Sequence, residues 1–175
     1  NDGTKMFLTG NNGDDVNEYT LSTGFDVSTA SFVDSFDISS QEKGPRDLAF
    51  SADGTKMFVV GVLGDDVNEY TLSTAFDVST SSFVDSFDIS SQEDSPTGLA
   101  FSKDGTKMFV AGNGGDDINE YTLSTGFDVS TASFVDSFDV SSQDTAPNGL
   151  TFNSDGTKMY VVGNQGNDIN EYDLT

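Results

Sequence analysis

Acidic residues recur in adjacent pairs at residues 14–15, 65–66 and 116–117, with Asn-Asp at residues 167–168, and each follows a stretch bounded by glycines such as residues 10–13. These stretches offer only carboxylate and amide oxygens, which are the ligands that Ca²⁺ prefers. No cofactor is required by the pattern, but if a cation binds, Ca²⁺ is the one expected. The residues predicted to hold it are Asp14, Asp15, Asp65, Asp66, Asp116, Asp117 and Asp168.

A second interpretation of the same residues needs no metal. Asp and Asn favour tight turns, and the second acid of each pair would begin the following strand. Residues 10–15 faintly resemble the glycine-aspartate calcium repeat, but Asn17 stands where that repeat needs an apolar residue, and the period is not that of a nonapeptide. The turn interpretation is therefore preferred to the calcium site.

Catalytic side chains are scarce. The chain contains no Cys and no His, which excludes thiolate nucleophiles, imidazole acid–base catalysis and zinc sites of the Cys/His kind. Paired carboxylates can hydrolyse glycosides, but acids repeated identically in every unit lack the unlike environments that this chemistry needs. Asp53, which precedes Gly54, is explained by a turn. We therefore expect no catalytic residues and no enzymatic activity.

The charge balance limits the partners. Thirty acidic residues stand against seven basic ones, for a net charge of -23. Nucleic acids and anionic membranes are also negatively charged, so no binding to either is expected. Cations, glycans and proteins remain. No stretch reaches the roughly 20 apolar residues that cross a bilayer, and residue 1 opens on a turn, so no membrane insertion and no targeting segment are expected. An acidic chain of this kind favours an extracellular, cell-surface or virion-associated location.

The elements that position these residues are set by an internal repeat. The hexapeptide Asp-Gly-Thr-Lys-Met-Phe begins at Asp2, Asp53 and Asp104, and it returns at Asp155 with Tyr160 in place of Phe. The spacing is 51 residues each time. A strict period over four copies indicates a repeat architecture.

Each repeat contains four predicted strands. In the third repeat they cover residues 98–102, 107–111, 117–123 and 133–141. Apolar residues alternate with polar ones in the last of these, which predicts Phe134, Asp136 and Phe138 on one face of an outer strand. Residues 102–105 predict a type I turn with Gly105 in the left-handed conformation.

Four antiparallel strands every 51 residues match one blade of an all-β propeller. The segments LAFSADGTKMFVVG (48–61) and LAFSKDGTKMFVAG (99–112) resemble the YVTN-type and lactonase-like propeller repeats. The resemblance implies the propeller fold. It does not by itself imply one activity, because such blades occur in enzymes and in structural proteins.

The chain is predicted to be a single repeat array, residues 1–175, of about 3.5 four-stranded blades. Its parts are a partial blade 1–40, two blades 47–91 and 98–142, and a partial blade 148–175. The link that precedes the first strand of a blade and the link that follows its second strand should lie on the same face of the propeller, which makes that face acidic. Unpaired edges at both ends suggest a homo-oligomer or further repeats of the same array.

Three functions are weighed on these grounds. The first is a non-catalytic structural or adhesive protein that forms a propeller scaffold or a self-assembled filament through contacts between blades. The alternative is a module that binds a cation, a glycan or a protein on its acidic face. A propeller-fold hydrolase or lactonase, suggested by the resemblance alone, ranks last, because the residues supply no evident catalytic set.

Overall fold

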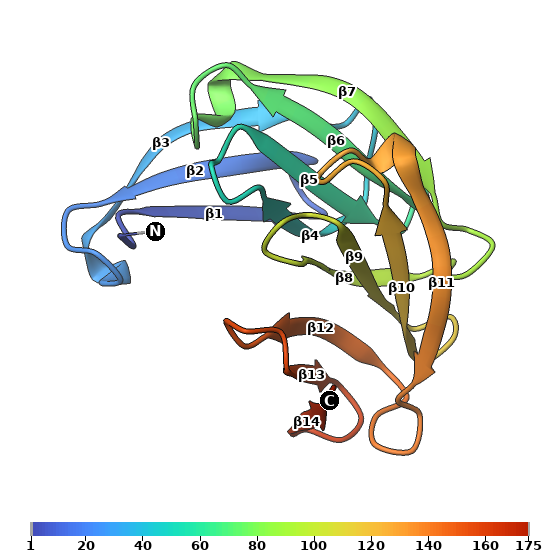
Figure 1. Ribbon diagram of the computed structural model, residues 1–175. Coiled ribbons are helices and arrows are strands. Elements are labelled where there is room, and N and C mark those ends of the chain that lie inside the picture. Colours follow the sequence, from blue (N-terminus) through green and yellow to red (C-terminus); the bar gives the residue numbers. More distant parts are fainter. Residues whose placement is uncertain (1, 175) are drawn as a thin grey trace.

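The computed structural model describes residues 2–174, which form four antiparallel sheets fanned around a common axis (Figure 1). The first sheet contains β1 (Lys5–Gly10), β2 (Asp15–Leu21) and β3 (Ala30–Asp37). The second contains β4 (Pro45–Phe50), β5 (Lys56–Gly61), β6 (Asp66–Leu72) and β7 (Ser81–Asp88). The third contains β8 (Pro96–Phe101), β9 (Lys107–Gly112), β10 (Asp117–Leu123) and β11 (Ala132–Asp139). The fourth contains β12 (Pro147–Phe152), β13 (Lys158–Gly163) and β14 (Ile169–Asp173).

The predicted all-β propeller of about 3.5 blades is confirmed. In each sheet, strands that follow one another in sequence pair side by side. Figure 1 shows β4, β8 and β12 innermost and β3, β7 and β11 outermost. We call the sheets blades 1 to 4 in chain order. The second strand of each complete blade is almost continuously apolar because neighbouring blades cover both of its faces.

The Asp-Gly pair of the repeated hexapeptide closes the turn between the first two strands of a blade. Gly54 has φ +72° and donates its backbone N–H to Ser51 O at 2.9 Å. Hydrogen bonds from the hydroxyl of Ser51 and from Thr55 lower the pKa of Asp53 to about 2. Gly105 repeats the left-handed conformation with φ +71°. The predicted turn is confirmed, and these hydrogen bonds give the Asp53 carboxylate a role in the turn.

A short helical turn links the last two strands of each of the first three blades: η1 (Val27–Thr29), η2 (Val78–Thr80) and η3 (Val129–Thr131). The residue two positions earlier, such as Phe76, has a positive φ. Its ring lies 5.5 Å from Phe50 of its own blade and 6.4 Å from Phe7 of the preceding blade. This link therefore contacts two neighbouring blades and holds them together. Among residues 2–174 no helix has the length and apolar character needed to cross a membrane.

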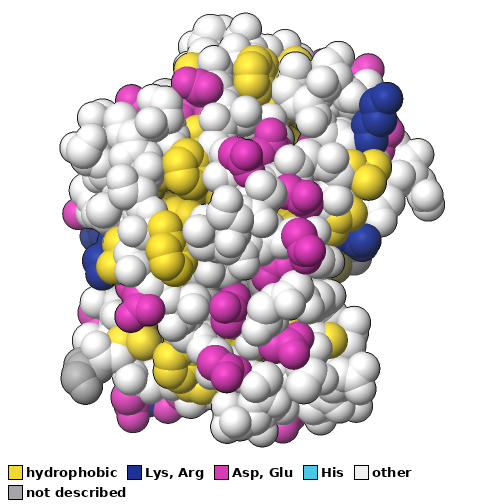
Figure 2. Space-filling model, turned by 90° about the vertical axis from the view of Figure 1, so that its right-hand side faces the viewer, with side chains coloured by type: hydrophobic (Ala, Val, Ile, Leu, Met, Phe, Trp, Pro, Cys, Tyr) yellow, Lys and Arg dark blue, Asp and Glu magenta, His cyan; other side chains and the backbone are white. Residues whose placement is uncertain are grey.

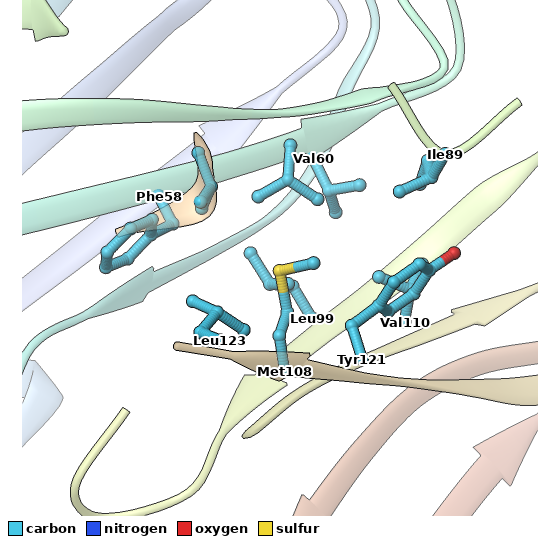
Figure 3. Close-up of a cluster of buried hydrophobic side chains, with 10 residues drawn as sticks. Phe58, Val60, Ile89, Leu99, Met108, Val110, Tyr121 and Leu123 are labelled. Carbon is cyan, nitrogen blue, oxygen red and sulfur yellow. The ribbon is translucent and has the colours of Figure 1, made fainter. Parts of the chain in front are cut away.

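The core consists of layers between blades. Figure 3 shows the layer between blades 2 and 3, where Phe58, Met108 and Tyr121 are fully buried. Phe58 lies 4.5 Å from Phe101 and 6.1 Å from Phe127, measured between ring centroids. An equivalent layer between blades 1 and 2 contains Tyr70. Apolar packing between successive sheets thus holds the arc together.

The outermost strands differ from the predicted alternation. A β-bulge at Val135 makes Glu120 pair with Asp136 and Tyr121 pair with Phe134. Phe134 therefore faces Tyr121 of its own blade, at 5.7 Å, while Phe138 contacts Tyr172 of the next blade at 5.1 Å. The prediction that Phe134, Asp136 and Phe138 share one face is wrong, because the extra residue of the bulge turns the strand over.

Links between strands gather on two opposite ends of the blades, as the topology predicted. The buried carboxylate of Glu42, which lies before β4, accepts hydrogen bonds from the backbone N–H groups of Leu63 at 3.3 Å and Gly64 at 3.2 Å in the turn after β5. At the other end, Phe76 donates its N–H to Gly54 O at 2.9 Å. We call the end that carries Glu42 the upper face. Figure 2 shows the outer side of the arc, where acidic side chains form a run across the blades.

Candidate functional site

The blades differ in charge at the start of their innermost strands. Arg46 and Asp47 are the second and third residues of β4. At the equivalent places β8 has Thr97 and Gly98, and β12 has Asn148 and Gly149. Blade 2 thus carries a cation and a carboxylate where blades 3 and 4 are neutral. Because β4 is an innermost strand, this charged pair lies beside the axis of the propeller (Figure 1).

The Asp47 carboxylate is held between two innermost strands. Its Oδ2 accepts a hydrogen bond from Leu99 N of the next blade at 2.8 Å, and its Oδ1 accepts one from Leu48 N at 2.8 Å. Burial raises the pKa of Asp47, and the two hydrogen bonds oppose that shift in part. The side chain keeps intermediate exposure. Asp47 is therefore a fixed carboxylate that solvent can reach and whose basicity is raised.

Arg46 is exposed and is positioned by the neighbouring blade. With its amide oriented to satisfy both groups, Asn11 donates to Pro45 O at 3.0 Å and accepts from an Arg46 guanidinium nitrogen at 3.2 Å. Lys43 is exposed on the same link. Lys43, Arg46 and Lys103 are the basic residues that form no ion pair within residues 2–174. Two of these three free cations, Lys43 and Arg46, thus belong to the segment of the chain that leads into Asp47.

This arrangement supports hydrolysis assisted by a base. A carboxylate with raised pKa can take a proton from an attacking water molecule. A guanidinium can hold an anionic group of a substrate, or the negative charge that develops on a carbonyl oxygen. Neither role needs Cys or His.

The residues predicted to bind calcium lie in the turns of the upper face. Asp14, Asp65 and Asp116 have positive φ values of 51°, 49° and 54°, a conformation that Asp tolerates in turns. The carboxylates of the other four predicted residues accept hydrogen bonds from an asparagine two positions on: they are Asp15, Asp66, Asp117 and Asp168.

The structure brings these acids together only in small groups. Asp66 pairs in register with Asp88 of the next strand, and burial, followed by the charges of Glu42 and Asp88, raises the pKa of Asp66. Within the described part of the chain no three acidic side chains are placed to hold one metal ion. Turn geometry accounts for the acids, and the calcium site stays a prediction.

Two hollows between blades lie at the opposite end from Asp47. Lys5 and Phe76 line one of them, and Lys56 and Phe127 line the other. Both lysines are ion-paired with a glutamate, and each also donates to a backbone carbonyl oxygen. These polar groups are therefore satisfied by the fold itself, and the candidate site is placed at Arg46 and Asp47.

Reasoning from the sequence missed Asp47. The predicted features are those that recur in every repeat, and Asp47 does not recur. The available signal was the departure from the period, a charged pair in one blade opposite neutral residues in the others. This departure indicates a site only once the position is known to lie on the innermost strand of the blade.

The family model described as "Lactonase, 7-bladed beta-propeller" matches residues 3–174. Among solved structures, a putative 6-phosphogluconolactonase from Bacteroides uniformis is similar with a TM-score of 0.70 and 16% identity, covering 99% of this chain and 48% of that chain. A putative 6-phosphogluconolactonase from Bacteroides fragilis gives a TM-score of 0.70, 14% identity and coverage of 98% and 48%.

The periplasmic gluconolactonase of Pseudomonas aeruginosa is similar with a TM-score of 0.63 and 19% identity, covering 98% of this chain and 47% of that chain. The chain thus spans about half the length of these proteins. The search of curated proteins gave no significant match.

These findings overturn three expectations drawn from the sequence. A family of enzymes matches nearly the whole chain, so the expectation of no enzymatic activity is wrong. The interpretation as a structural or adhesive protein that self-assembles into filaments is wrong for the same reason, and the module that only binds a ligand is not favoured either. The repeats are nearly identical, but Arg46 and Asp47 distinguish blade 2 from blades 3 and 4.

Proposed function

Because the chain belongs to the seven-bladed β-propeller lactonase family, we propose that it acts in the hydrolysis of lactones, with Asp47 as the general base. The observation that carries this proposal is the charged pair on β4, Arg46 and Asp47, at a position that is neutral in the other blades. The YVTN-type likeness is proposed for the first hairpin of each blade and adds no activity.

The proposed reaction adds water to the lactone carbonyl. Asp47 accepts one proton from the water as its oxygen bonds to the carbonyl carbon, and Arg46 donates hydrogen bonds to the oxyanion or to an anionic group nearby. The bond between the carbonyl carbon and the ring oxygen then breaks. The ring oxygen takes up a proton, and the product is an open-chain hydroxy acid. The raised pKa of Asp47 strengthens it as a base for the first step.

The surroundings of Asp47 favour a lactone that carries a negative charge. Lys43 and Arg46 are free of ion pairs on a face that is otherwise acidic. A guanidinium can bind a phosphate through two parallel hydrogen bonds. Two of the similar structures are named putative 6-phosphogluconolactonases. We therefore propose a phosphorylated sugar lactone as the substrate class.

Replacing Arg46 tests whether the protein prefers a phosphorylated lactone to a neutral one. Arg46→Gln should raise the KM for 6-phosphogluconolactone by about 10- to 100-fold, the effect of losing a charged hydrogen bond. The KM for neutral gluconolactone should change little. Initial rates of lactone opening, corrected for the spontaneous reaction, measure both values.

The matched control is Lys103→Gln, which removes an exposed, unpaired cation from the opposite end of a blade. It should leave both KM values unchanged. A wild-type chain that opens neither lactone faster than the spontaneous reaction would contradict the proposed function. Equal effects of Arg46→Gln on the two substrates would contradict the substrate class alone.

A further inference from the structure

Blade 2 departs from the repeat in the link that precedes β4. This link contains Lys43 and Arg46, two exposed cations that form no ion pair within residues 2–174. Blade 3 has Asp94 and Thr97 at the equivalent positions. In a chain with a net charge of -23, the link of blade 2 is therefore a local source of unpaired positive charge.

The turn after β5 departs from the repeat in the same blade. It contains Val62 and Leu63, whereas the equivalent turns have Asn-Asn in blade 1, Asn-Gly in blade 3 and Asn-Gln in blade 4. Leu63 is 69% exposed, and Val62 is half-buried. Two aliphatic side chains thus stand where the other blades of this chain have polar residues or glycine. We call Val62 and Leu63 the aliphatic wall.

The aliphatic wall lies against the link that carries the two cations. Val62 donates its backbone N–H to Gly44 O at 3.1 Å, and Leu63 donates its backbone N–H to the buried Glu42 carboxylate at 3.3 Å. A Cβ atom at Gly44 would lie 3.0 Å from Val62 Cγ2 and 3.3 Å from Leu63 Cγ, so glycine at this position makes room for both side chains. Because Gly44 lies between the two cations in the chain, the wall and the positive charges form one surface.

Packing within the fold does not account for the exposed side chain of Leu63. Val60 and Val67, in the same hairpin, are fully buried, but Leu63 remains largely in solvent. Blade 2 packs against a blade on either side (Figure 1), so this exposure is independent of where the chain begins and ends. Apolar side chains next to a few positioned polar groups are the usual composition of small-molecule sites.

We propose that the aliphatic wall, Lys43 and Arg46 together bind an amphiphilic anion, a small soluble molecule with a phosphate or carboxylate group and an aliphatic chain. The Arg46 guanidinium binds the anionic group through paired hydrogen bonds, and Lys43 adds a second positive charge. The aliphatic chain packs on the wall and is removed from water. The inference goes beyond the proposed function, because it concerns binding and holds whether or not the chain opens lactones.

The charge of the whole chain favours a small ligand over a membrane surface. A bilayer of anionic lipids extends far beyond the two cations and meets the excess of acidic residues, thirty against seven basic ones. A small anion responds mainly to charges within the screening distance, about 8 Å at physiological salt. Lys43 and Arg46 can therefore attract a small anion although the chain as a whole is acidic.

Calorimetric titration with methyl phosphate and hexyl phosphate tests the site without any lactone. The wild type should bind hexyl phosphate about 10-fold or more tightly than methyl phosphate, because the longer chain buries methylene groups on the aliphatic wall. Leu63→Asn, which introduces the residue type that blade 1 has at Asn12, should reduce this ratio to about 2-fold. Arg46→Gln should weaken the binding of both phosphates by about 10-fold or more.

The matched control is Val84→Asn, because Val84 is 51% exposed on β7 and lies outside the site. It should leave both affinities as in the wild type, and circular dichroism checks that each variant is folded. Equal affinities of the wild type for the two phosphates, no binding of either, or a ratio that Leu63→Asn leaves unchanged would overturn the proposal.

Cosedimentation with phosphatidylglycerol vesicles distinguishes a soluble ligand from a membrane lipid. The wild type should stay in the supernatant, and a protein that bound the vesicles but not hexyl phosphate would contradict the proposed ligand class. A wild type that binds hexyl phosphate as expected but opens no lactone would contradict the proposed function alone.

Discussion

Replacing Asp47 with Asn should lower kcat for lactone opening by about 100-fold or more, since a positioned general base contributes on the order of 10²- to 10⁴-fold. The amide fills the same space but cannot take a proton from water. KM should change little, because Arg46 and Lys43 remain. Steady-state rates with 6-phosphogluconolactone, corrected for spontaneous opening, measure the effect.

The pH dependence of the same reaction assigns the effect to the Asp47 carboxylate. Burial raises the pKa of Asp47, and the base acts in its charged form. The wild-type rate should therefore rise with pH through that raised pKa, and the Asp47→Asn variant should lose this rise. Asp85→Asn is the matched control: Asp85 also accepts a hydrogen bond from the next backbone N–H, at 2.8 Å, but it lies on the outermost strand. Equal losses in both variants would count against Asp47.

Replacing Phe58 with Ala should lower the free energy of unfolding by about 3 to 5 kcal/mol, the usual cost of removing a buried aromatic ring. Phe58 is fully buried in the layer between blades 2 and 3 and contacts the rings of Phe101 and Phe127. Its loss would leave a cavity that two sheets cannot easily close. Denaturant unfolding followed by circular dichroism measures the change.

The control for this substitution is Leu63→Ala, because Leu63 is 69% exposed in the turn after β5. It should change the free energy of unfolding by no more than about 0.5 kcal/mol. If Phe58→Ala cost as little as Leu63→Ala, packing between blades would not be what holds the arc together.

The repeat made most of the fold predictable. A strict period, apolar runs at alternate positions and the Asp-Gly turn are local features, and each reports directly on the backbone around it. The orientation of Phe138 was not predictable in this way. It depends on the bulge at Val135, which is seen only when β11 is paired with β10.

The candidate site was not predictable from the repeat, because it lies where one blade departs from the others. Repeated residues build the blade, so attention to them led away from the place where one blade departs from the rest. Asp47 gains its raised pKa and its partner Leu99 from the approach of β8 to β4, which a comparison of sequence letters does not reveal. The absence of Cys and His does not exclude hydrolysis, because a carboxylate can serve as the base.

One measurement tests most directly whether the charged start of β4 is the active site. It compares the rate of 6-phosphogluconolactone opening by the wild type with that of a double variant, Arg46→Thr with Asp47→Gly, in which β4 begins as β8 does at Thr97 and Gly98. We expect the wild type to open the lactone faster than the spontaneous reaction, and the double variant to match the spontaneous rate. A double variant as active as the wild type would contradict the claim.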